Sequence, residues 1–404
     1  MGSIEESSYS HQTKVDNLGK SLAAIVGLGM IKVGMHWSKS IRELAVEAGL
    51  KALDDAGNPD VDAVYVSNMA SGLFCDQENL ADLIADYLAL TPAPAVKIEA
   101  ACASGGVALT QAVAAVASGV YDTILLVGVE KMSELVSTEV TNAIACCLDA
   151  EYEKFYGVTF QAANALLMRM YMEKYRVKRE AFGEFVSLMH QNATKNPYAQ
   201  LRFPVTVEQY LNSPVIADPI RLLDCAPVGD GAAALVITST KKAKKVVDNP
   251  VFIKGIGQAT DTISIKDRVD PLFLRSVSKA AETAFQMAGC SIEDVDVVEL
   301  HDSFPFVAFM AMEALGLAER GKAYKLLENG DIKPGGKLPI NLSGGLKARG
   351  HPIGATGVYQ AAELSLQLIG EAGSLQADSP AKALMVSIGG VASNAAVIVL
   401  ERGD

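Results

Sequence analysis

Cys102 stands where a thiol could act as a nucleophile. It follows a strand expected to end near Glu99, and the small residues ASGG at 103–106 open a helix directly after it. Free backbone N–H groups and the positive end of the helix dipole would face the sulfur, so we expect a thiolate with a pKa below the ordinary ~8.5. Small neighbours leave room for an acyl group. In isolation, a cysteine among alanines is more often a packing residue. Whether Cys102 is catalytic therefore depends on the residues that lie near it.

Two histidines are the natural partners of this thiol. His351 stands in the glycine-dense turn GHPIGATG, and an imidazole can serve as the base for a thiol. His301 ends a predicted strand over 295–300 and could donate a hydrogen bond to a developing oxyanion, although a polar residue that caps a strand has the same pattern. The paired glycines of SIGG at 387–390 offer backbone N–H donors to a thioester oxygen; a simple turn has the same spacing.

An internal repeat predicts that these residues meet. AAIVGLG at 23–29 matches VFIKGIG at 251–257 as a first strand, and an amphipathic helical pattern follows in both copies. The turn that carries Cys102 corresponds to the turn that carries His351. Strands that alternate with helices predict a mostly parallel sheet with helices on its faces. Ligands bind beyond the carboxyl ends of such strands, so we expect both residues to face one cleft.

The repeat also predicts the domain organisation. An N-terminal lobe is expected over residues 21–132 plus 219–249, and a C-terminal lobe over 250–404. Residues 133–218 have no counterpart in the second copy, so they are interpreted as an inserted, mainly helical loop domain. Residues 1–20 are polar and aperiodic, which predicts a flexible N-terminal arm.

Composition excludes several classes of function. A formal net charge of −12 opposes nucleic-acid binding, which depends on neutralising phosphates. No apolar run is long enough to cross a membrane. The cysteines show no CxxC spacing and no secretion signal precedes them, which favours a reducing, cytoplasmic location and predicts no metal site. They are Cys75, Cys102, Cys146, Cys147, Cys225 and Cys290.

Four motifs together resemble the thiolase superfamily. They are EAACASGG around Cys102, VELHDSF around His301, SGGLKARGHPIGATG around His351 and SIGG at Ser387. HDSF, NATKNPYAQ and DCAPVGDGAAALV are similar to the sterol-carrier-protein and archaeal-type acetyl-CoA acetyltransferase branch. The resemblance implies two pseudo-symmetric βαβαβαββ lobes in a layered αβαβα arrangement with an inserted loop domain. It also implies coenzyme A thioesters as substrates, no bound cofactor, and a Claisen condensation or its thiolytic reverse.

The resemblance implies a role for each matching residue. Cys102 would be acylated after His351 removes its proton. His301 and His351 would hold the thioester oxygen of the second substrate. The backbone N–H groups of Cys102 and Gly389 would stabilise the oxygen of the acyl-enzyme.

The sequence departs from other thiolases at the second cysteine, which acts there as acid and base. Ser387 and Ser303 stand at the two positions that carry it, and a serine hydroxyl is a far poorer base than a thiolate. The candidate proton carriers are therefore Ser303, Ser387 and Cys225, with Cys75 as a further substitute.

Arg221 and Arg349 are candidates for contacts with coenzyme phosphates. The leading hypothesis is a short-chain acyl-CoA C-acyltransferase similar to acetoacetyl-CoA thiolase, and the resemblance implies a homodimer or homotetramer. One alternative is a condensing or retro-aldol enzyme that needs a small OB-fold, zinc-ribbon partner. Another is a scaffold subunit in a complex with 3-hydroxy-3-methylglutaryl-CoA synthase.

Overall fold

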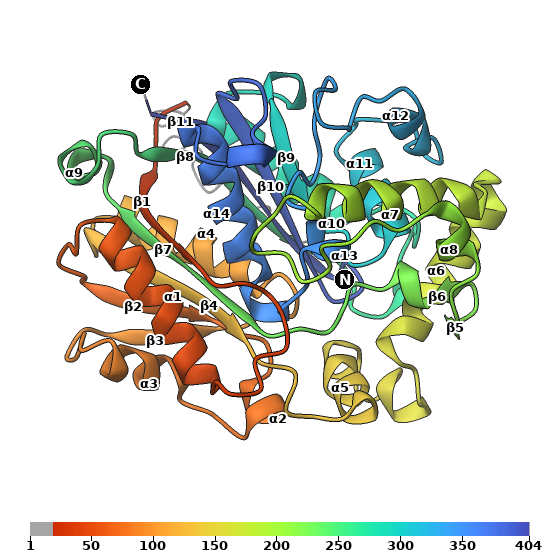
Figure 1. Ribbon diagram of the computed structural model, residues 1–404, viewed down its shortest axis with the longest axis horizontal. Helices are drawn as coiled ribbons and strands as arrows, with labels where there is room; N and C mark the ends of the chain where they lie inside the picture. Colours follow the sequence, from red (N-terminus) through yellow and green to blue (C-terminus); the bar gives the residue numbers. More distant parts are fainter. Residues whose placement is uncertain (1–18, 404) are drawn as a thin grey trace, which may run out of the picture.

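The computed structural model describes residues 19–403, in which two long helices lie between the halves of one large sheet (Figure 1). Nearly all of the predicted N-terminal arm, residues 1–18, lies outside the described residues. Among the described residues, no helix is both long and apolar enough to cross a bilayer.

The sheet has nine strands in the order β3-β2-β4-β7-β1-β8-β11-β10-β9. The first half contains β1 (Ala23–Met30), β2 (Ala63–Ser67), β3 (Ala95–Ile98), β4 (Thr123–Glu130) and β7 (Gly231–Thr238). The second half contains β8 (Val251–Thr260), β9 (Val297–Leu300), β10 (Lys382–Gly389) and β11 (Asn394–Arg402).

The two halves repeat one topology. In the first, β3, β2 and β4 are parallel, and β7 pairs antiparallel with both β4 and β1. In the second, β9 and β10 are parallel, and β11 pairs antiparallel with both β10 and β8. A parallel bridge between Val298 and Ile340 takes the place of β3, which is reduced there to one residue pair. The mostly parallel, pseudo-symmetric arrangement predicted from the repeat is confirmed.

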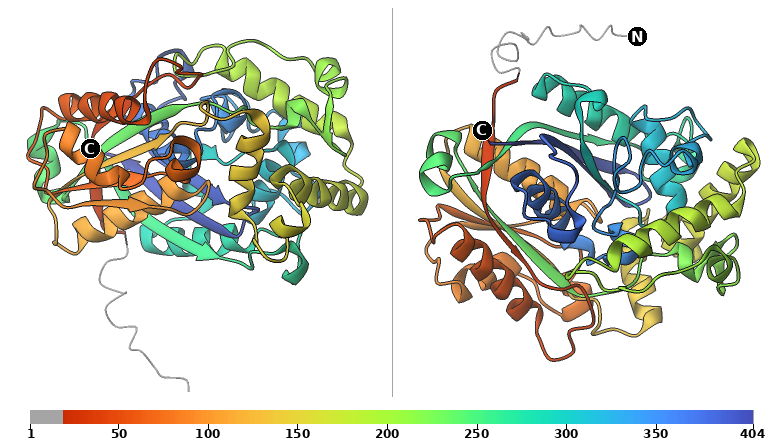
Figure 2. Two further views of the ribbon diagram at one scale, coloured as in Figure 1. Left: turned by 90° about the horizontal axis from the view of Figure 1, so that it is seen from below. Right: turned by 45° about the horizontal axis from the view of Figure 1, so that its top comes forward.

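The halves are joined along a short antiparallel contact between Ala23–Ile25 of β1 and Val251–Ile253 of β8. Beyond this contact they diverge, and α4 (Ser104–Ala117) and α14 (Thr356–Ile369) fill the space between them (Figure 2). Helices α1 (Ile41–Asp55) and α3 (Leu80–Tyr87) cover the outer face of the first half, and α10 (Arg275–Ala288) covers that of the second. The predicted αβαβα layering is therefore confirmed.

The outer helix α1 shows how the sequence sets these elements. Ser40 and Glu43 form a capping box, in which the Ser40 hydroxyl accepts from Glu43 N and the Glu43 carboxylate accepts from Ser40 N. Apolar residues at three- and four-residue spacing then face the sheet, and Leu44 and Ala48 are fully buried. The helix ends at Asp55, before the left-handed Gly57.

The segment between β4 and β7 holds α5 (Ser137–Ile144), α6 (Phe160–Tyr175), α7 (Arg179–Ala193), α8 (Val207–Leu211) and the β5–β6 hairpin (Val215–Ala217, Ile220–Arg221). The remaining helices are α2 (Ser71–Cys75), α9 (Thr240–Val246), α11 (Pro305–Ala314), α12 (Tyr324–Glu328) and α13 (Gly345–Ala348). Helix α7 packs against α11, α12 and α13, so the inserted segment lies against the carboxyl-end loops of the second half.

The first turns of α4 and α14 touch backbone to backbone through glycines. A Cβ on Gly105 would lie 2.8 Å from the amide nitrogens of Gly357 and Val358, and a Cβ on Gly357 would lie 2.3 Å from Gly106 N. No other residue fits this contact without moving one helix. Because Cys102 and His351 directly precede these helices, the contact sets the distance between them.

We expect Gly357→Ala to separate the two helices and to lower the free energy of unfolding by about 1–3 kcal/mol, as overpacking does. Urea denaturation measures this change. Gly34→Ala is the matched control, because nothing lies within 4 Å of a Cβ at Gly34. Equal stability of the Gly357→Ala and wild-type proteins would contradict the contact.

Candidate active site

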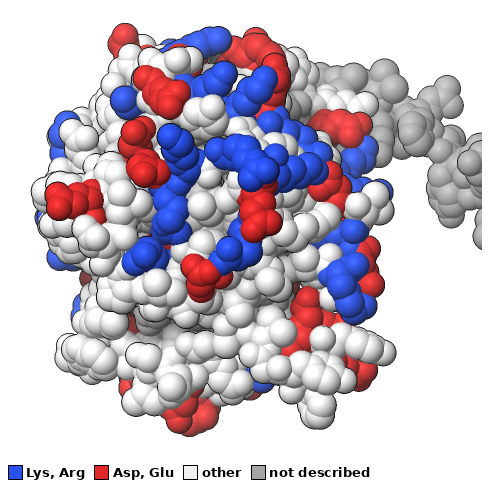
Figure 3. Space-filling model, turned by 90° about the vertical axis from the view of Figure 1, so that its right-hand side faces the viewer, with Lys and Arg blue, Asp and Glu red and all other residues white. Residues whose placement is uncertain are grey.

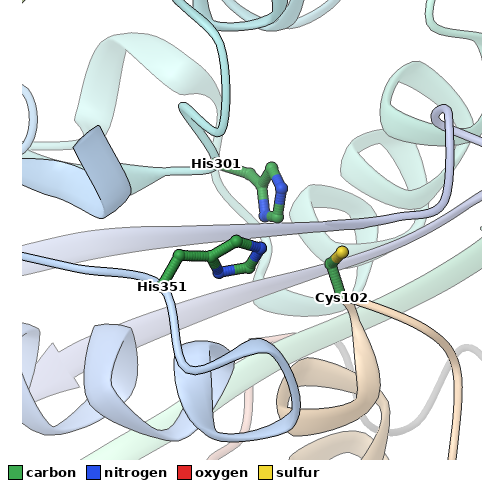
Figure 4. Close-up of side chains that lie close together, drawn as sticks. All are labelled: Cys102, His301 and His351. Atoms are coloured by element: carbon green, nitrogen blue, oxygen red, sulfur yellow. The ribbon is translucent and has the colours of Figure 1, made fainter. Parts of the chain in front are cut away.

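Cys102, His301 and His351 converge at the carboxyl end of the sheet, from both halves (Figure 4). The Cys102 sulfur and one ring nitrogen from each histidine all lie within 4.8 Å of one another. The exposed fractions of the three side chains are 1%, 1% and 8%. The structure thus brings together, in a desolvated site, Cys102 and His351, which the repeat predicted to meet, and His301.

A strained turn presents the thiol. Ala101 adopts a left-handed backbone conformation with φ of 51°, which is unfavourable for a residue with a Cβ. The Ser104 hydroxyl donates to Ala101 O at 2.6 Å and accepts from Ala100 N at 2.9 Å. These bonds close the turn and point Cys102 toward the histidines.

The prediction that Cys102 rests as a thiolate is wrong. Burial raises the pKa of its thiol to about 12, because the sulfur is desolvated, and this outweighs hydrogen bonds from the N–H groups of Gly390 and of Cys102 itself. The predicted pair of N–H donors was Cys102 and Gly389, whereas the second N–H group at the sulfur belongs to Gly390. A neutral thiol can attack a substrate only with a base beside it.

His351 is held in the tautomer that such a base requires. Its Nδ1 lies 2.7 Å from the hydroxyl oxygen of Thr356. The single hydroxyl proton of Thr356 is donated to Pro352 O at 2.9 Å, so the hydroxyl accepts from His351 Nδ1–H. The lone pair on His351 Nε2 therefore remains free to accept the thiol proton.

Both imidazoles are neutral at ordinary pH. Burial, together with the positive charge of Arg349, lowers the pKa of His301 to about 3. Burial lowers the pKa of His351 well below its usual value as well, and His301 and Arg349 add to the effect. The rings are perpendicular, with centroids 5.3 Å apart. His301 Nδ1 has no hydrogen-bond partner among the described residues, which leaves a buried polar atom for a ligand.

The interpretation of Arg349 as a contact for coenzyme phosphate is wrong. Its side chain is fully buried, its Nε lies 3.3 Å from Glu363 Oε2, and its guanidinium stacks over Tyr359 at 5.0 Å. It acts on the site through its charge. Arg221 is partly exposed, so it stays a candidate for a phosphate contact. Its Nη1 donates to Ser213 O at 2.6 Å.

The candidate proton carriers occupy different places. Ser303 and Cys225 line one cavity of about 70 Å³ together with Cys102 and His351. Ser387 does not line it: its hydroxyl is fully buried against the first turn of α4 and has no hydrogen-bond partner among the described residues. Cys75 lies outside this cavity too, and its thiol donates to Lys131 O.

Sequence reasoning missed Glu130, the fully buried last residue of β4. Its carboxylate accepts from Met69 N and Gly354 N, each at 2.8 Å, and from the Asn68 amide at 2.8 Å. It therefore ties the loop after β2 to the GHPIG turn. A charged residue at the end of a fully apolar strand was the available signal.

The donor set of the site also suits a soft divalent metal such as Zn²⁺, which accepts thiolate and imidazole ligands. Among the described residues it is the only group of this kind. A metal bound there would occupy the sulfur and His351 Nε2, so we expect it to block thiol chemistry.

Lys and Arg side chains gather on the face at the right-hand side of Figure 1, although the formal net charge of the chain is −12 (Figure 3). Two segments rich in Lys and Arg lie there, one at the end of α6 and the other around the start of α12. They meet where the Arg320 guanidinium lies 5.8 Å from the Tyr175 ring centroid. Their exposed members include Lys174, Arg176, Lys178, Lys322 and Lys325. An anionic ligand can approach this face without crossing a uniformly negative surface.

Comparison with known proteins gives one consistent family. The family model described as "Thiolase, N-terminal domain" matches residues 23–241, and "Thiolase C-terminal domain-like" matches residues 257–402. An acetyl-CoA acetyltransferase of Methanothermobacter thermautotrophicus is 45% identical over 94% of this chain and 99% of its own length. Human sterol carrier protein 2 is 33% identical over 90% of this chain and 69% of its own length.

Solved structures share the fold. The Ltp2-ChsH2(DUF35) aldolase superposes with a TM-score of 0.81 at 24% identity, over 95% of this chain and 98% of that one. Human mitochondrial 3-ketoacyl-CoA thiolase in complex with CoA superposes with a TM-score of 0.73 at 18% identity, over 95% and 99%.

We expect Thr356→Val to slow alkylation of Cys102 by iodoacetamide at pH 7 by about 10–100-fold, the usual cost of losing a group that orients a catalytic ligand. Without the hydroxyl, Nδ1–H is no longer favoured, and the tautomer that protonates Nε2 cannot accept the thiol proton. Thr356→Ser keeps the hydroxyl and should retain the rate. Alkylation of Thr356→Val at the wild-type rate would rule out this role.

Proposed function

The chain belongs to the thiolase family and is a thiolase-type acyltransferase; on that premise we propose that it is a short-chain acyl-CoA C-acyltransferase that carries the acyl group on Cys102. The observation that carries the proposal is the Cys102 sulfur within 4.8 Å of two neutral imidazoles. The acetyl-CoA acetyltransferase relative at 45% identity supports the choice of substrate.

In the first half-reaction, His351 Nε2 takes the proton of Cys102 as the sulfur attacks the thioester carbon. The carbonyl oxygen becomes negative, and the backbone N–H groups of Cys102 and Gly390, which face the sulfur, are assigned to stabilise it. When the carbon–sulfur bond of the thioester breaks, His351 returns the proton to the leaving coenzyme A thiolate. The imidazole is neutral before and after, which fits its lowered pKa.

In the second half-reaction, His301 is assigned to donate to the thioester oxygen of a second acyl-CoA, because Nε2 of the neutral His351 carries no proton. The α-carbon loses a proton to a second base and attacks the acyl group on Cys102. The carbon–carbon bond forms as the carbon–sulfur bond to Cys102 breaks, and the proton passes to the departing Cys102 thiolate. Thiolysis is the same sequence in reverse. Coenzyme A thioesters are substrates in both directions, whereas free coenzyme A is released in condensation and consumed in thiolysis; the proposal needs no bound cofactor.

The size of the cavity supports a short acyl chain. Its volume of about 70 Å³ makes it a small cavity. Phe160, Ile144 and Phe304 line its walls, so a longer chain would have to displace packed side chains.

A second candidate function is a condensing or retro-aldol enzyme that acts with a small OB-fold, zinc-ribbon partner. It is favoured by Ser303 and Ser387, which stand where other thiolases carry the second cysteine. The fold shared with the Ltp2-ChsH2(DUF35) aldolase is compatible with it.

Brief exposure of the wild-type protein to acetyl-CoA should add one acetyl group to Cys102, as detected by peptide mass spectrometry. Cys102→Ser should lose this adduct and lower the rate of acetoacetyl-CoA thiolysis by about 10³-fold or more. Cys146→Ala is the matched control, because Cys146 is an exposed cysteine of the inserted segment. Full thiolysis by Cys102→Ser would falsify the acyl-enzyme.

The two candidate functions make opposite predictions for the purified chain. As an acyltransferase, it should catalyse acetoacetyl-CoA thiolysis alone, with turnover that addition of an OB-fold protein leaves unchanged. Steady-state kinetics with and without a copurified small partner decide between them. Activity that depends on the partner would favour the second candidate.

A further inference from the structure

A buried lysine next to the acyl cavity has no role in the chemistry described so far. Lys347 on α13 is 2% exposed, and its Nζ donates to Cys225 O at 2.9 Å. No carboxylate of the described residues lies within 4.0 Å of this nitrogen, although a buried charge is usually paired. Burial therefore lowers the pKa of Lys347 to about 8.

The surroundings of Lys347 define its electrostatics. Asp302 and Asp224 face it at longer range and favour its charged form, as does Cys225 when it is a thiolate. His190 on α7 lies on another side, and the lysine charge lowers the pKa of that imidazole further. The ammonium group thus lies in a desolvated position where its proton is easily released.

Cys225 connects this lysine to the site. It lines the same cavity as Cys102 and His351, and its thiol donates to Arg221 O at 3.6 Å. Burial raises the pKa of this thiol to about 12, and the positive charge of Lys347 opposes that effect. Its neighbour Ala226 donates a backbone hydrogen bond to Ser303 O at 3.0 Å, which places the Cys225 segment beside the HDSF turn. A thiol therefore lies next to the position where other thiolases carry a cysteine and this chain carries Ser303.

We propose that Cys225 is the second acid and base of the site, and that Lys347 is a positioning residue that fixes the Cys225 backbone and stabilises its thiolate. This inference rests on the proposed acyltransferase function. The serines are weaker candidates, because Ser387 is buried outside the cavity and the hydroxyl of Ser303 is a poor base.

The proton balance closes. For condensation, the Cys225 thiol leaves its bond to Arg221 O and passes its proton to neutral Lys347. Only a small population of thiolate beside ammonium forms, because the pKa of the thiol, about 12, lies above that of the lysine, about 8. The thiolate takes the α-proton of the second acyl-CoA as the new carbon–carbon bond forms and the bond from the acyl carbon to Cys102 breaks. That proton then passes to the departing Cys102 thiolate, and Lys347 returns its proton to Cys225. In thiolysis, the Cys225 thiol protonates the enolate that leaves.

The test separates the two half-reactions in the full-length protein. Cys225→Ala should acetylate Cys102 from acetyl-CoA at nearly the wild-type rate, because His351 alone moves that proton. Its kcat/KM for acetoacetyl-CoA thiolysis should fall by about 10²-fold or more, the usual contribution of a general acid. Cys290→Ala is the matched control, because Cys290 is a free cysteine that does not line the cavity.

A second variant distinguishes the loss of a proton carrier from misfolding of the Cys225→Ala protein. Adding Ser303→Cys to Cys225→Ala should restore at least about a tenth of the wild-type thiolysis rate, since both side chains line one cavity. Unchanged thiolysis by Cys225→Ala, or loss of both half-reactions without rescue, would overturn the proposal. A wild-type protein that forms no acyl-Cys102 would instead overturn the acyltransferase function itself.

Lys347 is tested by its pH profile. The condensation rate of the wild-type protein should rise as the pH passes through about 8, where Lys347 begins to accept the Cys225 proton. Lys347→Met should lose this rise of the condensation rate with pH and should retain Cys102 acetylation. Lys347→Arg should lose the rise as well, because a guanidinium does not release its proton. An unshifted profile in Lys347→Met would assign the lysine a structural role only.

Discussion

The close approach of α4 and α14 through Gly105 and Gly357 is the constraint on which the rest of the structure depends. Each glycine lies where any Cβ would meet the backbone of the other helix. The two helices are equivalent in the repeat, so their amino ends meet near the pseudo-symmetry axis, and the turns before them face each other. The nucleophile and its base therefore come from different halves, and neither half contains a complete site.

Burial at this junction determines the chemistry. Desolvation raises the pKa of Cys102 and lowers the pKa of both histidines, so the resting site holds neutral groups rather than a thiolate–imidazolium pair. The buried charge of Arg349 reinforces the neutral form of the histidines. Ionisation is thus expected only when a substrate supplies an oxygen that can take up the developing negative charge.

The sequence was sufficient to predict the lobes, the layers and the meeting of Cys102 with His351, because all three follow from a repeat of strands, helices and glycine-rich turns. It could not predict the pKa of Cys102, since a helix amino end was visible in the sequence while the loss of solvent around the sulfur was not. The interpretation of Arg349 as a phosphate contact was wrong for the same reason. Its neighbours in the chain gave no sign of Glu363 and Tyr359, which contact its side chain in the structure.

The position of the second proton carrier illustrates a more general limit of motif comparison. A motif assigns a role to a place in the chain, whereas proton transfer needs only a group of suitable pKa that reaches the substrate. The walls of this cavity come from several segments, among them the stretch before β7 and the HDSF turn, which a backbone hydrogen bond holds side by side. A thiol on either wall reaches the same space. The serine at the expected position is therefore compatible with a complete reaction cycle, provided that the adjacent wall supplies the sulfur.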